Sequence, residues 1–302
     1  MPIGPESEPA AARRRLRASL MMLGCVLVFC LMDAVLKVLS AHYPPFEVAA
    51  LRGASSLPWL LAWAAATTGL RPLWRVRWSL HLLRGALGIL MMASFVYALR
   101  SLPLSTAYAI FFVAPLLITA LSVPVLGEHV GPRRWTAIAV GFAGVVVVLR
   151  PSGGGMLTLA GMAVLLAAFG YAVSAITVRI LARSDSTQAM VVWLMALMAL
   201  GAGLLAWPQW EPLRMEHAWL ILGLGVAGAV GQYLITEAFR IGEASLLAPL
   251  EYTALAWGVL LDLAIWGVLP DAATWIGAAI IVGSGWYLIR REGRGAKVAT
   301  PP

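Results

Sequence analysis

A succession of ten long apolar segments, joined by short connections, constrains this chain more than any other feature. A helix needs about 20 predominantly apolar residues to span a bilayer, and most of the segments approach or exceed that length. Of the 302 residues, 61% are apolar and 12% are charged. A soluble globule of this size cannot bury so much apolar surface, so we expect the bilayer to be the solvent. The segments are 19–39, 46–68, 80–100, 104–126, 135–149, 157–178, 188–207, 217–239, 244–267 and 273–290.

This composition argues against a soluble enzyme, a disordered chain and a disulfide-stapled secreted domain. The net charge of +8 does not indicate nucleic-acid binding, because the basic residues form short clusters between apolar segments instead of a continuous patch. Cys25 and Cys30 stand five residues apart, on different faces of a helix, so we expect neither a disulfide nor a metal site. The four histidines match no zinc spacing, and we expect no cofactor.

No sequence pattern of an enzyme active site stands out. The segment 223–228 matches the glycine pattern of dinucleotide sites, but it lies inside an apolar segment, where no strand-to-helix loop is expected. We interpret it as a small-residue face that lets two helices approach closely. The chain is therefore expected not to be an enzyme.

The distribution of lysine and arginine predicts the orientation of the chain in the membrane. If the N-terminus is cytoplasmic, sixteen of the 22 basic residues fall on the cytoplasmic side, three on the opposite side and three within the segments. The first segment resembles a signal peptide, but Asp33 and Lys37 interrupt it and nine further segments follow, so we expect it to be retained. We predict cytoplasmic ends at 1–18 and 291–302 and localisation in the bacterial inner membrane.

The second half of the chain repeats the first. A shift of 140 residues overlays 81–150 on 221–290 with twelve identities and no gap. Five segments in each half would give the halves opposite orientations, an arrangement typical of secondary transporters. We therefore predict an all-α membrane protein of ten transmembrane helices, built from two inverted five-helix repeats at 19–150 and 156–290.

Two prolines stand in equivalent helices of the two halves, Pro115 in the middle of the fourth segment and Pro249 early in the ninth. Each removes one helical hydrogen bond and frees a carbonyl one turn earlier, so we predict a kink at both. A freed carbonyl in the membrane lines a cavity or finds a protein partner, and the sequence leaves these alternatives open.

Charged residues within the segments need partners or water, because isolated charges in the bilayer are costly. At 1.5 Å per residue, Arg84 and Glu251 share a layer about 6–10 Å from the cytoplasmic end, and Asp33 and Arg52 share one about 9–10 Å from the outer end. We expect Arg84 to approach Glu251, and Asp33 to approach Lys37 or Arg52. Lys37 and Arg52 are expected to act as structural ion pairs.

A cavity between these layers would offer an anion binder and a cation binder, as a zwitterionic amino acid requires. Neutral donors and aromatic walls would complete the site. The alternative is that the charged pairs are structural and the substrate contacts only neutral side chains. The expected substrate-binding residues are Asp33, Arg84, Tyr97, Tyr108, Tyr171, Gln232, Glu251 and Tyr252.

Several stretches carry a resemblance to a known family: 29–37 (FCLMDAVLK), 97–100 (YALR) through Ala114-Pro115, 127–128 (GE) and 248–255 (APLEYTAL). From about residue 19 to 291 the chain resembles the EamA branch of the drug/metabolite transporter superfamily. One departure is that Phe29-Cys30 stands where many members carry Trp-Gly. The resemblance implies a central cavity walled by the first, third, fourth, sixth, eighth and ninth helices.

The resemblance implies transport of a small molecule but does not fix the substrate, because the family includes amino-acid exporters and uptake carriers for riboflavin or S-adenosylmethionine. We expect a monomeric exporter of amino acids, including aromatic ones. The alternative is an uptake carrier for a vitamin or nucleoside-like cofactor. A channel would need a continuous polar stripe, whereas the ten segments carry only scattered polar residues.

Overall fold

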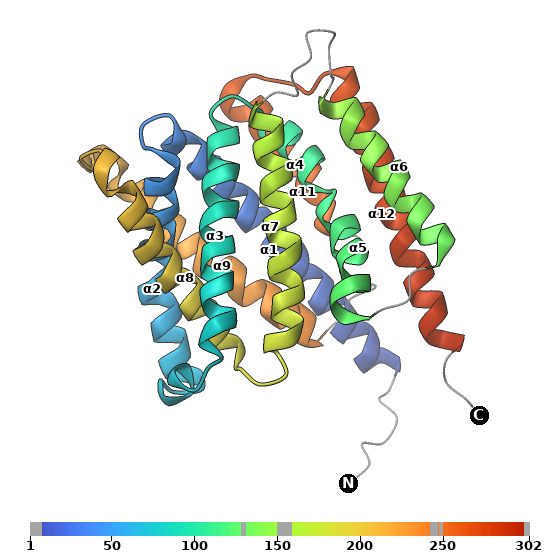
Figure 1. Cartoon of the computed structure of the whole chain (residues 1–302), viewed down its shortest axis with the longest axis horizontal. Coiled ribbons are helices and arrows are strands. Elements are labelled where there is room, and N and C mark those ends of the chain that lie inside the picture. The colour runs from blue at the N-terminus through green and yellow to red at the C-terminus, as the bar shows by residue number, and fades with distance from the viewer. Residues whose placement is uncertain (1–7, 128–130, 150–158, 242–246, 248–249, 299–302) are drawn as a thin grey trace.

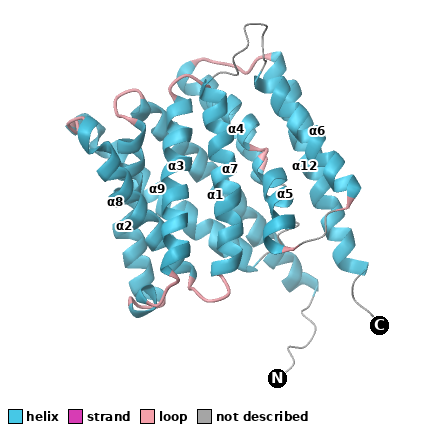
Figure 2. Ribbon diagram, in the orientation of Figure 1, coloured by secondary structure: helices cyan, strands magenta, loops and turns pink. Residues whose placement is uncertain are grey.

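The computed structural model describes residues 8–127, 131–149, 159–241, 247 and 250–298, and over these ranges it contains helices and connections but no β-strand (Figure 2). The first five apolar segments form α1 (Glu8–Ser40), α2 (Pro45–Thr67), α3 (Trp78–Leu99), α4 (Leu104–Phe111) with α5 (Ala114–Leu126), and α6 (Pro132–Leu149). The others form α7 (Leu159–Leu181), α8 (Thr187–Ala206), α9 (Ala218–Ile241), α11 (Thr253–Leu261) with a π-helical turn (Asp262–Trp266), and α12 (Ala272–Val298).

Each predicted apolar segment is helical over most of its described residues. Six described stretches are long and apolar enough to cross a membrane: α1, α3, α4 together with α5, α7, α8 and α9. Two shorter apolar stretches are Trp135–Leu149 and Thr253–Trp266. These observations support an all-helical, multi-pass membrane protein.

The fourth predicted segment is interrupted where the sequence places Pro115. Helix α4 ends at Phe111 and α5 begins at Ala114, with Pro115 in its first turn. Proline suits that position, because the first amides of a helix have no partner within it. The interruption makes α4 a separate short helix. Pro249, in the equivalent segment of the second half, lies outside the described residues.

Gly127 and Gly267, which the 140-residue shift aligns, play the same role in the two halves. Gly127 follows α5 with φ of 70°, and Gly267 follows the π-helical turn with φ of 66°. Glycine adopts this left-handed conformation without the Cβ clash that other residues incur, so it ends a helix cleanly. The fourth segment and the ninth therefore end in the same way.

The helices pack in pairs that join the two halves of the chain. The most extensive contacts are between α2 and α8, α1 and α9, α6 and α12, and α3 and α7. Figure 1 shows α6 and α12 side by side at one edge of the bundle. If each segment of the first half is exchanged with its counterpart in the second half, the α1–α9 pair becomes the α7–α3 pair. The α2–α8 and α6–α12 pairs remain unchanged by the exchange. The pattern of contacts is therefore two-fold.

The glycine pattern at 223–228 is a packing face, as predicted. A Cβ at Gly225 would lie 2.3 Å from the Ser55 carbonyl oxygen, and one at Gly228 would lie 2.6 Å from the Ser56 hydroxyl. No such neighbour stands within 4 Å of Gly223. Two of the three glycines thus allow α9 to cross α2 at close range.

Candidate functional site

Helix α4 is held at its N-terminus by a buried aspartate from the opposite half. Asp262 accepts hydrogen bonds from the amides of Leu104 and Ser105, at 2.9 and 2.8 Å, and from the Ser105 hydroxyl at 2.7 Å. Lys37 of α1 forms an ion pair with the same carboxylate at 3.2 Å, and its ammonium lies 4.2 Å from the centre of the Trp266 ring. A carboxylate satisfies the free amides of a helix N-terminus, so α4 is rigidly placed.

The fixed helix α4 presents Tyr108 to Asp33 of α1. The Tyr108 hydroxyl donates a hydrogen bond of 2.9 Å to the Asp33 carboxylate. Arg52 of α2 lies close enough to Asp33 for the two charges to interact. Its guanidinium contacts the Met92 sulfur at 3.5 Å, a weak acceptor, and its Nε has no hydrogen-bond partner. The arginine therefore keeps donor capacity for a ligand.

Aromatic rings continue from Tyr108 across the bundle. Phe95 of α3 stacks on Tyr108, with ring centres 6.5 Å apart and planes 15° apart. Phe111, one turn after Tyr108 on α4, meets Phe95 at 5.9 Å and Tyr171 of α7 at 5.5 Å. These spacings are typical of interacting aromatic pairs, so the four rings form a continuous wall.

A second carboxylate stands at the far end of this wall. Glu251, which precedes α11, is half-buried and close enough to Tyr171, Tyr252 and Cys25 to interact with them electrostatically. It has no hydrogen-bond or ion-pair partner among the described residues. We call the assembled residues the central cluster: Asp33, Arg52, Phe95, Tyr108, Phe111, Tyr171 and Glu251.

Of the two expected charge pairs, that of Arg84 with Glu251 is wrong, whereas Asp33 lies close to Arg52, the second of its two expected partners. Arg84 donates a 3.0 Å hydrogen bond to the Met190 carbonyl of α8 and does not approach Glu251. Lys37 pairs with Asp262 and not with Asp33. Depth along a helix gives the layer of a side chain but not the neighbour it faces, and α3 turns Arg84 toward α8.

The remaining expected site residues lie at different places. Tyr97 is 38% exposed and has no hydrogen-bond partner among the described residues. Tyr252 packs its ring against Phe112 at 5.1 Å, and its buried hydroxyl lies against Gly285, where a Cβ would leave no room for it. Gln232 is half-buried on α9. Tyr97 therefore lies outside the central cluster, whereas Tyr252 borders it through Glu251.

Phe95 is not among the site residues expected from the sequence, and Arg52 is expected only as a structural ion pair. Phe95 is 8% exposed, whereas Tyr97, two residues further along α3, is 38% exposed. Residues two apart on a helix point in nearly opposite directions, so only one of them can face the bundle interior. The glycines Gly85 and Gly88, which pack against α8, mark a buried side of α3 and could have indicated its direction.

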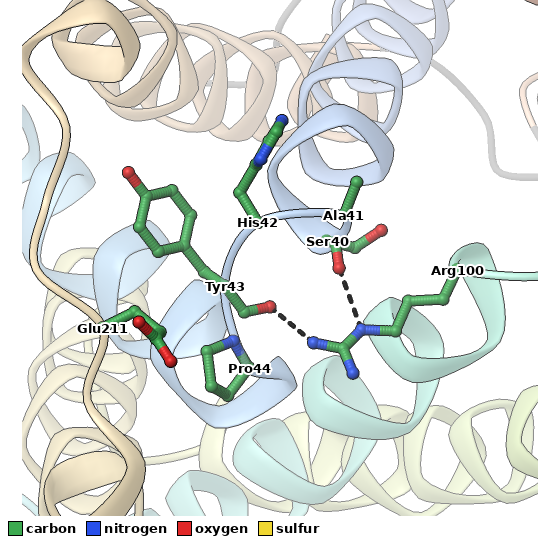
Figure 3. Close-up of a pocket in the computed structure, with 7 residues that line it drawn as sticks. All are labelled: Ser40, Ala41, His42, Tyr43, Pro44, Arg100 and Glu211. Atoms are coloured by element: carbon green, nitrogen blue, oxygen red, sulfur yellow. Dashed lines mark hydrogen bonds between the residues drawn. The ribbon is translucent and has the colours of Figure 1, made fainter.

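One cavity of the described structure is separate from the central cluster. It has a volume of about 390 Å³ and lies where α1 meets α2, lined by Tyr43, Arg100 and Glu211 among others (Figure 3). Arg100 donates to the carbonyl oxygens of Ser40 and Tyr43, at 2.9 and 2.8 Å, so its guanidinium is already engaged. Among the described residues, no group of histidine, cysteine and acidic side chains could hold a metal ion.

Comparison with known proteins shows the family. The model of the EamA-like transporter family matches the chain twice, over residues 16–150 and 158–290. The chain therefore belongs to the EamA-like transporter family and is a multi-pass membrane protein with two EamA domains. The central cluster draws its residues from both domains.

The named relatives transport different small molecules. A riboflavin transporter of Vibrio cholerae is 31% identical over 282 residues, covering 92% of this chain and 94% of the relative. An S-adenosylmethionine uptake transporter of Rickettsia prowazekii is 30% identical and covers 86% of this chain and 88% of the relative. The pseudopaline exporter CntI of Pseudomonas aeruginosa is 26% identical, with 76% and 82% coverage.

Proposed function

We propose that the protein takes up a flat heteroaromatic metabolite of the riboflavin type across the bacterial inner membrane. The observation that carries this proposal is the aromatic wall of the central cluster, which has a charged group at each end. Conjugated rings bind well to aromatic side chains, because stacking combines a large contact area with favourable quadrupole geometry. Similarity to a riboflavin transporter over nearly the whole chain supports the same substrate class.

The charged end at Asp33 suits the polar edge of such a ring. Arg52 has free N–H donors beside the Asp33 carboxylate, which has an acceptor oxygen beyond the one bound by Tyr108. A donor beside an acceptor complements the neighbouring carbonyl and N–H of a cyclic amide, as in the flavin ring. Under this proposal Arg52 and Asp33 bind that edge, and the aromatic wall holds the plane of the ring.

The transport mechanism we propose is alternating access between two inverted five-helix halves, with both termini in the cytoplasm and the protein acting as a monomer. Three observations support the inverted relation. The helix pairs map onto one another when the halves are exchanged, Gly127 and Gly267 end equivalent helices, and the family model matches each half. In inverted repeats the substrate site lies between the halves, where the central cluster stands.

Uptake into proteoliposomes tests the proposal, with labelled riboflavin, S-adenosylmethionine and phenylalanine in parallel. We expect saturable riboflavin uptake that unlabelled phenylalanine does not inhibit. Tyr108→Phe should reduce riboflavin uptake about tenfold, because it removes the hydrogen bond that orients Asp33. The matched control Tyr97→Phe removes an exposed hydroxyl outside the central cluster and should leave uptake unchanged. Uptake of phenylalanine but not riboflavin would contradict the proposal.

The similarity to a pseudopaline exporter favours a second candidate, export of an amino-acid-derived metabolite. Arg52 and Glu251 would then bind the carboxylate and the ammonium group of a zwitterion. Vesicles of defined orientation distinguish the two functions. Riboflavin accumulation in right-side-out vesicles supports uptake, whereas amino-acid accumulation confined to inside-out vesicles supports export.

A further inference from the structure

A buried histidine ties the start of α3 to the loop between α7 and α8. The His81 ring lies 2.9 Å from the Asp185 carboxylate, and both side chains are almost fully buried. The same carboxylate oxygen accepts the backbone amide of Arg77 at 3.1 Å, and the other accepts the Ser184 hydroxyl at 2.6 Å. We call this the 81–185 contact. It joins the first half of the chain to the second.

A second histidine makes a corresponding connection at the start of α9. His217, in a short 3-10 turn (Met215–His217) that leads into the helix, lies 2.8 Å from the Tyr43 hydroxyl. The backbone amide of Arg214 donates to the same hydroxyl at 3.0 Å. His42 lies beside the His217 ring, with 4.6 Å between ring centres. We call this the 43–217 contact, and it too joins the two halves.

The two contacts lie at opposite ends of the bundle. Arg100, just after the end of α3, bonds to the carbonyls of Ser40 and Tyr43, which places the C-terminal end of α3 at the 43–217 contact (Figure 3). His81 lies in the first turn of the same helix. Because His81 and Arg100 are 19 residues apart along the helix, the contacts are separated by about 28 Å.

The two contacts exchange when the halves are exchanged. His81 stands at the start of the third helix of the first half and reaches the loop between the first two helices of the second half. His217 stands at the start of the third helix of the second half and reaches the loop between the first two helices of the first half. In each contact, a backbone amide three or four residues before the histidine binds the same oxygen. The 140-residue shift aligns His217 with Arg77, one turn before His81. The two histidines therefore occupy corresponding regions of the two halves but not aligned sequence positions.

We propose that the 81–185 and 43–217 contacts are paired clamps that hold the two faces of the transporter closed, and that each transport step breaks one clamp and keeps the other. The proposal rests on alternating access, although not on the identity of the substrate. Each clamp joins different halves at one face, so separation of the halves at that face must stretch it. A hydrogen bond weakens steeply once its atoms separate beyond about 3.5 Å, so a small opening suffices.

Amide hydrogen exchange of the full-length protein in lipid nanodiscs tests this proposal without any substrate. Asp185→Asn should speed exchange about tenfold in 74–82 and 182–188, because it weakens charge-assisted bonds. It should also slow exchange at the far end, in 40–46 and 210–217, because opening one face keeps the other closed. Tyr43→Phe should produce the reverse pattern with a smaller change. These far-end effects are what a merely structural contact would not cause.

Two control variants remove a hydrogen bond without touching a clamp. Ser40→Ala removes a bond within α1 near the 43–217 contact, and Thr177→Val removes one within α7. Neither should protect the far end. If Asp185→Asn or Tyr43→Phe fails to fold, His81→Gln and His217→Gln repeat the test by changing the histidine of each clamp. Variants that loosen only their own end would overturn the proposal, whatever the transported substrate proves to be.

Discussion

The two ends of the molecule use the same architecture with different chemistry. At the 81–185 contact a carboxylate accepts three hydrogen bonds, whereas at the 43–217 contact a tyrosine hydroxyl accepts the Arg214 amide and shares a hydrogen bond with the His217 ring. Hydrogen bonds to charged groups contribute about 1.5–3 kcal/mol, against about 1 kcal/mol for neutral ones. Under the proposed clamp model, the end held by the 81–185 contact is the harder to open, and the basic residues predict that it is the cytoplasmic end.

The largest effect is expected from Asp185→Ala. This variant leaves the buried His81 ring and the Arg77 amide without their acceptor, and we expect it to lower the free energy of unfolding by about 3 kcal/mol. Thermal melting in detergent with size-exclusion chromatography measures the loss. A decrease no greater than that of Tyr43→Phe would show that the carboxylate adds nothing to this end.

Acidification should act on the same end. Although burial opposes it, hydrogen bonds from Ser184, His81 and the Arg77 amide hold the pKa of Asp185 below its ordinary value of 3.8. A depressed carboxyl pKa gives stability that is present above pH about 4 and is lost as the pH falls further. Melting curves between pH 5 and 3 should show a steeper loss of stability for the natural protein than for Asp185→Asn. Parallel curves would contradict this assignment.

A smaller effect is expected from Tyr43→Phe. The variant keeps the aromatic ring and removes only the hydroxyl that binds His217 and the Arg214 amide. We expect a decrease of about 1 kcal/mol in the free energy of unfolding, measured by the same melting experiment. An effect equal to that of Asp185→Ala would remove the difference between the two ends.

The sequence is sufficient to predict an all-helical chain with several membrane spans, because long apolar segments favour helices in a bilayer. It also placed the break before Pro115 and matched Gly127 with Gly267, since proline and glycine restrict the backbone locally. Tyr108 and Asp33 were both expected site residues, and the structure brings them together. Local chemistry is therefore readable from the chain.

Partners across helices were not predictable in the same way. Lys37 and Asp33 are one turn apart and looked like a pair, yet Lys37 reaches Asp262, 225 residues away. The rotation of each helix about its axis decides such contacts, and that rotation depends on packing against every neighbour. Tyr97 was expected in the site for its hydroxyl, although the helix turns Phe95 inward instead.

Riboflavin fluorescence tests most directly the proposal that the aromatic wall between the two halves binds a flat heteroaromatic ring. Stacking on tyrosine quenches flavin emission, so titration of the purified protein into riboflavin should give saturable quenching. Tyr108→Phe and Arg52→Gln should weaken the binding about tenfold, while Tyr97→Phe should not change it. Methylation of the flavin ring N–H should weaken it similarly. Quenching that is absent, or that is the same in all these variants, would contradict the account.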